Sequence, residues 1–120
     1  SLLGREQMTQ YIRISRELGL SALVEAHSEE EVSMAADAGA GIIGINNRNL
    51  KTFEVDFSNA LKLRRLVGPD TIFVAESGIR TARDIEALAE AEVDAVLIGE
   101  TLMRAPDRKT ALAELKRGCR

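Results

Sequence analysis

Four short apolar runs, each ending in polar residues and each followed by a segment of helical character, constrain the fold of this 120-residue chain most strongly. The runs span residues 22–27, 41–47, 72–78 and 95–100. Runs that are apolar almost without interruption are typical of strands covered on both faces, as in parallel sheets. A spacing of about 20 to 30 residues between runs suits successive βα units. The pattern therefore predicts an α/β protein built from four parallel βα units.

The segments between the runs predict the helices. A first helix over residues 5–18 precedes the repeat and places Met8, Tyr11, Ile12 and Leu18 on one face. Ser28, followed three residues later by Glu31, has the spacing of a capping box and predicts a helix start. Further helices are expected after Ser58 as N-cap, over about residues 82–91, and near residues 109–115.

Two architectures fit this element order: an open four-stranded sheet, or half of a TIM (β/α)8 barrel. Complete barrels take about 250 residues, twice the present length, and their site residues come from the ends of several strands. The second architecture is therefore favoured. We expect a single half-barrel domain over residues 1–120, with a helix at 5–18 in front of it.

Composition excludes several classes of protein. Only 3% of the residues are aromatic, the net charge is −3 and no basic stripe is present, so a nucleic-acid surface is not expected. The apolar runs are far shorter than the roughly 20 residues that span a bilayer, and nothing resembles a signal peptide. The single Cys119 can form no internal disulfide, which favours a reducing compartment and predicts a cytoplasmic protein.

Polar residues at the ends of the runs are the candidate functional residues, because parallel α/β proteins bind ligands at the carboxyl ends of their strands. The strand period of two places Leu23, Glu25 and His27 on one face, so Glu25 is expected at the mouth of the barrel. A carboxyl group there would be partly desolvated and suited to proton transfer. His27 is expected to be a loop residue, or one that supports the catalytic residues, rather than a catalyst.

The second strand ends in Asn46 and Arg48, whose amide and guanidinium groups suit a hydroxyl or a carboxylate. Without Arg48, Asn46 and Asn47 would be interpreted as a plain turn. No group of His, Cys or carboxylate residues has the spacing of metal ligands, so no metal is expected.

Glycines follow the third and fourth strands, where they permit close approach of an anion to the backbone. Ser77, Gly78, Gly99 and Glu100 are accordingly candidate phosphate-binding residues. Glu100 would have to act through its backbone N–H, since its carboxylate repels phosphate. Plain turns remain the competing interpretation for both glycines.

Together, the sequences of residues 23–27, 43–53, 75–79 and 97–103 resemble the motifs of the fifth to eighth strands of indole-3-glycerol phosphate synthases. The run Gly-Ile-Asn-Asn-Arg-Asn-Leu at residues 44–50 is the most specific of them. The resemblance covers nearly the whole chain.

The resemblance implies a lyase of tryptophan biosynthesis that needs no metal or organic cofactor. Its reaction closes an indole ring: carboxyphenylamino-deoxyribulose phosphate loses carbon dioxide and water to give indole-3-glycerol phosphate. By resemblance the catalytic residues are Glu25, Asn46 and Glu76, the substrate-binding residues are Arg48, Leu50 and Ser77, and the phosphate-binding residues are Ser77, Gly78, Gly99 and Glu100.

The chain departs from the family pattern because nothing in it matches the first four strands, on which the family carries its catalytic lysines. We therefore expect the isolated chain to be inactive. Its expected partners are a sugar-phosphate substrate and either the missing N-terminal half-barrel or a second copy of itself, and neither nucleic acid nor membrane. Two other functions stay open: another phosphate-binding barrel enzyme, such as a sugar-phosphate isomerase, and a non-catalytic half-barrel assembly module.

Overall fold

The computed structural model describes residues 3–119 and contains four strands, six α-helices and two short 3-10 helices in this part of the chain. The strands are β1 (Leu23–Ala26), β2 (Ile42–Asn46), β3 (Ile72–Glu76) and β4 (Ala95–Leu97). The helices are α1 (Arg5–Glu17), α2 (Glu29–Asp37), α3 (Ser58–Leu63), η1 (Arg64–Leu66), α4 (Ala82–Glu90), α5 (Glu100–Arg104), α6 (Arg108–Leu115) and η2 (Lys116–Gly118).

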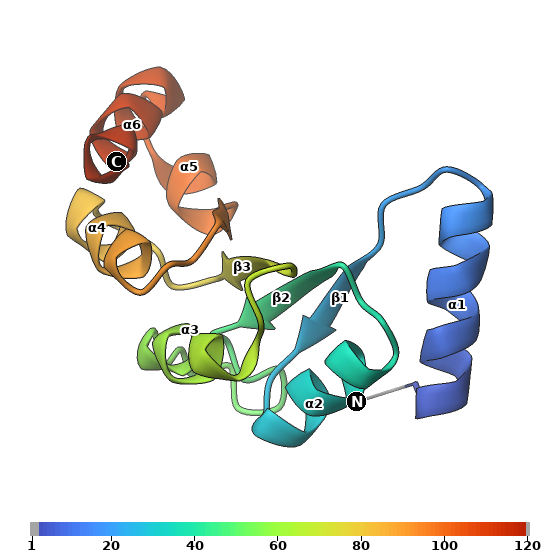
Figure 1. Ribbon diagram of the computed structural model, residues 1–120. Coiled ribbons are helices and arrows are strands. Elements are labelled where there is room, and N and C mark those ends of the chain that lie inside the picture. The colour runs from blue at the N-terminus through green and yellow to red at the C-terminus, as the bar shows by residue number, and fades with distance from the viewer. Residues whose placement is uncertain (1–2, 120) are drawn as a thin grey trace.

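The strands form one parallel sheet in the order β1-β2-β3-β4, so each strand pairs with the next one along the chain. Parallel connections are right-handed, and in strict sequential order they place their helices on the same face of the sheet. Figure 1 shows this arrangement, with α2 and α3 on one side of the strands. The fold is therefore half of a (β/α)8 barrel, as the sequence predicted, rather than a sheet covered on both faces.

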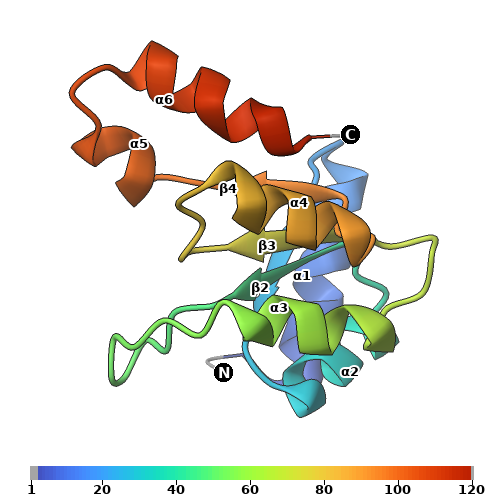
Figure 2. The ribbon, with the colours of Figure 1, turned by 90° about the vertical axis from the view of Figure 1, so that its left-hand side faces the viewer.

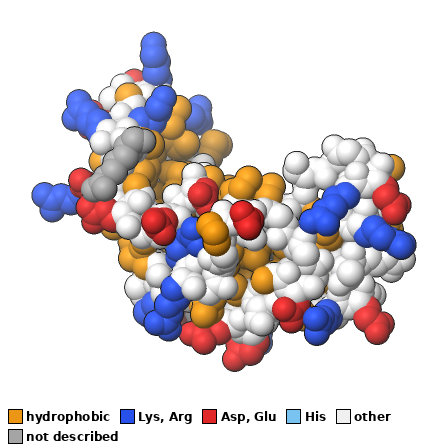
Figure 3. Space-filling view, viewed as in Figure 1, with side chains coloured by type: hydrophobic (Ala, Val, Ile, Leu, Met, Phe, Trp, Pro, Cys, Tyr) orange, Lys and Arg blue, Asp and Glu red, His pale blue; other side chains and the backbone are white. Residues whose placement is uncertain are grey.

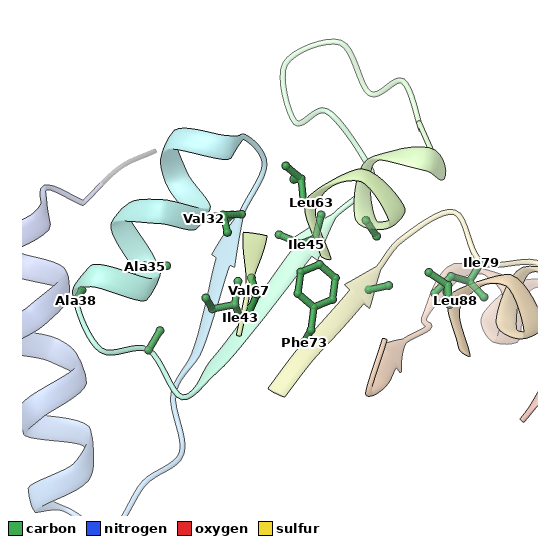
Figure 4. Packing of buried hydrophobic residues seen from close by; sticks show 14 of the residues in the cluster. Val32, Ala35, Ala38, Ile43, Ile45, Leu63, Val67, Phe73, Ile79 and Leu88 are labelled. Atoms are coloured by element: carbon green, nitrogen blue, oxygen red, sulfur yellow. The ribbon is translucent and has the colours of Figure 1, made fainter. Parts of the chain in front are cut away.

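The main core lies between the sheet and its helices. Ile43, Ile45 and Phe73 point from β2 and β3 toward the helices and are fully buried (Figure 4). Val32 on α2 and Leu63 on α3 pack against them in the same cluster. Burying each such side chain contributes about 1.5 to 3 kcal/mol, so this layer supplies most of the folding free energy.

The opposite, concave face of the sheet carries the alternate residues of each strand, and none of the helices within residues 3–119 covers it (Figure 1). Leu23, Ile72 and Leu97 lie on this face and are 43%, 48% and 50% exposed. In the space-filling view, hydrophobic side chains gather in the recess between α1 and the end of the molecule formed by α5 and α6 (Figure 3). Apolar side chains of this size normally lie in a core or an interface.

Side-chain caps mark the starts of α2, α4 and α6. The Ser28 hydroxyl accepts a hydrogen bond from the N–H of Glu31, as the capping-box spacing predicts. The Glu31 carboxylate closes the turn on the N–H of His27, one residue earlier than in a standard box. Thr81 and Asp84 form a complete capping box at the start of α4. None of the helices in the described range 3–119 is long and apolar enough to cross a membrane.

One helix was not predicted, and one helix start was predicted wrongly. The short helix α5 was not predicted, because its five residues show no apolar periodicity. Ser58 is the first residue of α3 rather than its cap, and its N–H and hydroxyl both donate to Asp56 Oδ1. The apolar face of α1 is only partly covered: Met8 and Ile12 are buried, whereas Tyr11 and Leu18 are exposed.

Candidate active site

The carboxyl ends of the four strands meet at one edge of the sheet, and the loop after β2 and helix α5 project beyond that edge (Figure 2). Glu25, Asn46 and Glu76 come from three adjacent strands. The register pairs Glu25 with Gly44 and Asn46 with Glu76, which places all three side chains on the concave face. The structure therefore brings together the three residues that the sequence analysis named as catalytic.

A hydrogen-bonded group joins the first two strands. Asn46 Nδ2 donates to Glu25 Oε1 over 3.1 Å, and His27 Nε2 lies 3.3 Å from the same oxygen. The other ring nitrogen of His27, Nδ1, lies 3.3 Å from the Asn46 carbonyl oxygen. Both contacts use Oε1 of Glu25, so neither neighbour occupies Oε2. His27 lies in the loop directly after β1, where the sequence analysis expected it, and contacts both Glu25 and Asn46.

Glu76 is the desolvated carboxyl of the site. Its residue is 6% exposed, and its buried Oε1 has no hydrogen-bond partner among residues 3–119. Burial, and after it the negative charge of Glu25, raise the pKa of the Glu76 carboxyl above its ordinary value, while His27 opposes this. We expected the desolvated group to be Glu25, but the Glu25 side chain at the sheet edge is 43% exposed.

A hollow of about 730 Å3 lies beside these residues, between the end of β3 and helix α5. Arg48, Ser77, Gly78, Gly99 and Glu100 line it, so the structure groups the predicted phosphate-binding residues with Arg48.

Glu100 forms ion pairs with two of the arginines that line this hollow. The Arg48 guanidinium contacts Glu100 Oε2 at 2.6 Å, and Arg104 Nε contacts Glu100 Oε1 at 3.0 Å. The Glu100 carboxylate is thus directed to two arginines.

The turn after β3 has an unusual backbone. Ser77 and Gly78 have φ angles of 65° and 76°, and a non-glycine residue in this region is uncommon. The Asn47 side chain holds the turn, because its Nδ2 donates to the Ser77 carbonyl oxygen over 3.1 Å. On the other side, the Thr101 hydroxyl donates to the Ile79 carbonyl oxygen over 2.6 Å and ties α5 to the same loop. Both walls of the hollow are therefore fixed by hydrogen bonds.

Leu50 is the one predicted site residue that the structure does not bring to this group. It lies in the loop between β2 and α3, is 55% exposed and does not line the hollow.

Asn47 was missed as a site-forming residue. Besides holding Ser77, its Oδ1 accepts a hydrogen bond from the N–H of Ala60 at the start of α3, and the residue is buried. The period of two along β2 was a usable signal, since it places Asn47 on the helix side with Ile43 and Ile45. A polar side chain there needs partners.

The arrangement suits proton transfer to a bound small molecule. Glu76 keeps its proton to higher pH than an ordinary glutamic acid, so it is able to donate it. Asn46 offers both a donor and an acceptor. Among residues 3–119, no three His, Cys, Asp or Glu side chains are grouped as metal ligands.

A family model described as indole-3-glycerol phosphate synthase matches residues 1–115. The chain is 57% identical over 116 residues to the indole-3-glycerol phosphate synthase of Ruminiclostridium cellulolyticum, covering 97% of this chain and 45% of that protein. It is equally similar to the synthase of Lachnoclostridium phytofermentans, covering 97% of this chain and 43% of that protein. The chain thus spans about half the length of the curated relatives it matches.

Solved structures of other proteins share the fold. Thiamine phosphate pyrophosphorylase from Pyrococcus furiosus superposes with a TM-score of 0.73 at 22% identity, covering 92% of this chain and 52% of that one. A mandelate oxidase gives a TM-score of 0.70 at 20% identity, covering 97% of this chain and 39% of that one. At these identities the likeness concerns the half-barrel fold alone.

Proposed function

The chain belongs to the indole-3-glycerol phosphate synthase family, and from that premise we propose that its strand ends form one half of a synthase active site. The reaction is closure of the indole ring of carboxyphenylamino-deoxyribulose phosphate, with loss of carbon dioxide and water. The observation that carries the proposal is the cluster of Glu25, Asn46 and Glu76 at the ends of three adjacent strands, beside a hollow that holds Arg48.

In this proposal the two carboxyl groups have different tasks. Glu25 is exposed and hydrogen-bonded through Oε1 only, so Oε2 is available to take a proton during dehydration. Glu76 is buried and its pKa is raised, which favours its protonated form and suits it to donate a proton near the reacting carbons. Asn46 fixes Glu25 and binds a substrate hydroxyl. No metal or organic cofactor takes part.

The substrate's two anionic groups fit the two sides of the hollow. Arg48 binds the carboxylate through its planar fork. The backbone at Ser77, Gly78 and Gly99 binds the phosphate, where glycine allows close approach. The Glu100 carboxylate pairs with Arg48 and Arg104, so in this proposal the phosphate is bound by the N–H of Glu100 rather than by its side chain. Leu50 lies in the loop between β2 and α3, so it contacts the aromatic ring of the substrate only when this loop folds toward the hollow.

We propose that the partner is the complementary half-barrel. Within the described residues β1 and β4 each have one neighbouring strand, which leaves their outer edges free to pair. The exposed Leu23, Ile72 and Leu97 then become the interior of a closed barrel. The same half supplies the family's lysines. The single thiol of Cys119, which is free, suits a reducing compartment such as the cytoplasm.

The test is reconstitution. The chain is mixed with the part of the Ruminiclostridium cellulolyticum synthase that it does not cover, and formation of indole-3-glycerol phosphate from the substrate is followed by fluorescence. We expect turnover in the mixture and none from either half alone.

A Glu25→Gln variant of the chain should lose about 100-fold or more in kcat in the same mixture, with KM changed less than about tenfold. A Ser77→Asp variant should instead weaken substrate binding by repelling phosphate. Turnover by the isolated chain, with a dimer in light scattering, would point to self-association instead. A stable 1:1 complex of the two halves without turnover would favour the alternative function, a non-catalytic half-barrel assembly module.

A further inference from the structure

Gly44 is an unusual residue for its place in the sheet. It lies in the middle of β2 between Ile43 and Ile45, and glycine weakens a strand because it has no side chain to pack. Its backbone does not require glycine, since Gly44 is not among the residues with positive φ, which include Gly19, Gly39 and Gly78. The reason for a glycine at this position must therefore lie in the space where a side chain would be.

That space is filled by Glu76. A Cβ atom built on Gly44 would overlap Glu76 Oε1 and lie 3.0 Å from Glu76 Cδ. The third nearest atom is Cδ1 of Leu23, at 3.1 Å, the far end of a side chain that is 43% exposed and free to shift. Glu76 is thus the group that a side chain at position 44 would displace.

The register shows what this placement achieves. Glu76 pairs with Asn46, yet its carboxyl lies two residues back along β2, over Gly44. Gly44 in turn pairs with Glu25 on the other side. The Glu76 carboxyl therefore lies over β2, above the residue that pairs with Glu25 of β1.

We propose that Gly44 is a positioning residue, whose missing side chain lets the Glu76 carboxyl lie across β2 next to Glu25. The catalytic meaning of this position rests on the proposed function; the steric claim does not. The raised pKa of Glu76 agrees with it, since both the burial and the nearness of Glu25 depend on the carboxyl lying there.

The steric claim is tested on the 120-residue chain by a double-mutant cycle. Gly44→Ala, Glu76→Ala and the double variant are compared by thermal unfolding, with Gly41→Ala as the matched control, because nothing lies within 4 Å of a Cβ there. Gly44→Ala should lower the Tm by about 5 °C with Glu76 present and should leave it unchanged or raise it when Glu76 is Ala. Gly41→Ala should leave the Tm nearly unchanged, both with Glu76 present and in the Glu76→Ala variant.

Recovery of a folded protein only in the double variant would support the proposal equally. If Gly44→Ala is as stable as Gly41→Ala, or is just as harmful without Glu76, Gly44 does not position Glu76 and the proposal is overturned.

The catalytic consequence is measured in the reconstituted barrel. A carboxyl displaced by about 1 Å should cost about 100-fold in kcat, with KM changed less than threefold, and the pH–rate profile should shift toward that of an ordinary glutamic acid. Gly41→Ala should leave kcat and the profile unchanged. If wild-type halves show no turnover while the stability cycle shows coupling, the proposed function fails and the positioning role stands. Full turnover by the Gly44→Ala variant would show that the positioning of Glu76 by Gly44 does not matter for catalysis.

Discussion

The two faces of the same four-stranded sheet differ in how far this chain completes them. On the helix side, Ile43, Ile45 and Phe73 are fully buried under helices that follow their own strands along the chain. On the concave side, Leu23, Ile72 and Leu97 remain about half exposed, and Glu76 has a buried oxygen without a partner in the part of the chain that the structure describes. The helix of each βα unit thus covers the outer face of its own strand. The concave face can be covered only by residues outside these four units.

The two faces therefore have different roles: residues on the helix side stabilise the fold, and residues on the concave side serve assembly and the proposed reaction. Side chains on the helix side fill a core that is already closed, so changes there should cost folding free energy. Side chains on the concave side carry the acid, amide and carboxylate groups at their strand ends, so changes there should cost assembly or turnover. The predictions below test this division.

The largest effect is expected from Phe73→Ala, which removes the largest fully buried side chain of the helix side. The free energy of unfolding should fall by about 3 to 5 kcal/mol, because the cavity cannot close in a packed core. Urea unfolding measures this. Ile72→Ala, the adjacent residue on the concave face, is the control and should cost less than about 1 kcal/mol. Equal losses for the two variants would contradict the difference between the faces.

The second largest effect is expected from Asn47→Ala, which should lower the free energy of unfolding by about 2 kcal/mol. The substitution leaves the N–H of Ala60 and the carbonyl oxygen of Ser77 without their side-chain partner in a buried place. Asn46→Ala, on the concave side, is the matched control and should change stability little while reducing turnover in the reconstituted barrel. A loss of stability for Asn46→Ala as large as that for Asn47→Ala would argue against the division.

A smaller, pH-dependent effect is expected from Glu76→Gln. A carboxyl whose pKa is raised on folding stabilises the fold while it stays protonated, and this contribution is lost as the pH rises through the raised pKa. Wild type should therefore lose stability relative to the Gln variant as the pH increases above the ordinary value of 4.5. Unfolding curves between pH 4 and pH 8 measure the difference. A difference that is constant across this range would contradict the burial of Glu76.

The smallest effect on stability is expected from Leu97→Ser, within about 0.5 kcal/mol of wild type in the isolated chain. Its effect should appear in assembly, because Leu97 has to enter the barrel interior. The affinity for the complementary half should fall about tenfold or more, as measured by titration calorimetry. Unchanged affinity would remove Leu97 from the interface.

The sequence was sufficient for the strands, since their apolar runs and polar ends are local features. It also identified Glu25, Asn46 and Glu76 as neighbours, because parallel strands bring their carboxyl ends to one edge. It did not show which carboxyl is buried. Glu76 is desolvated because its side chain crosses Gly44 on another strand, a contact that depends on register and reach rather than on periodicity.

The short helix α5 and the role of Asn47 were hidden for related reasons. A five-residue helix is too short to show a periodic face. The partners of Asn47 are backbone groups at residues 60 and 77, which the sequence does not connect to it.

In the proposed assembly, another half-barrel completes this sheet. Hydrogen exchange of the backbone amides, with and without the complementary half-barrel, tests this assembly most directly. In the chain alone, amides of β2 and β3 should be protected, whereas those on the outer edges of β1 and β4 should exchange faster. On mixing, Leu23–Ala26 and Ala95–Leu97 should gain protection while β2 and β3 change little. Edges that are already protected in the monomer, or that stay unprotected in a 1:1 complex, would contradict the view that this sheet is completed by the other half of a barrel.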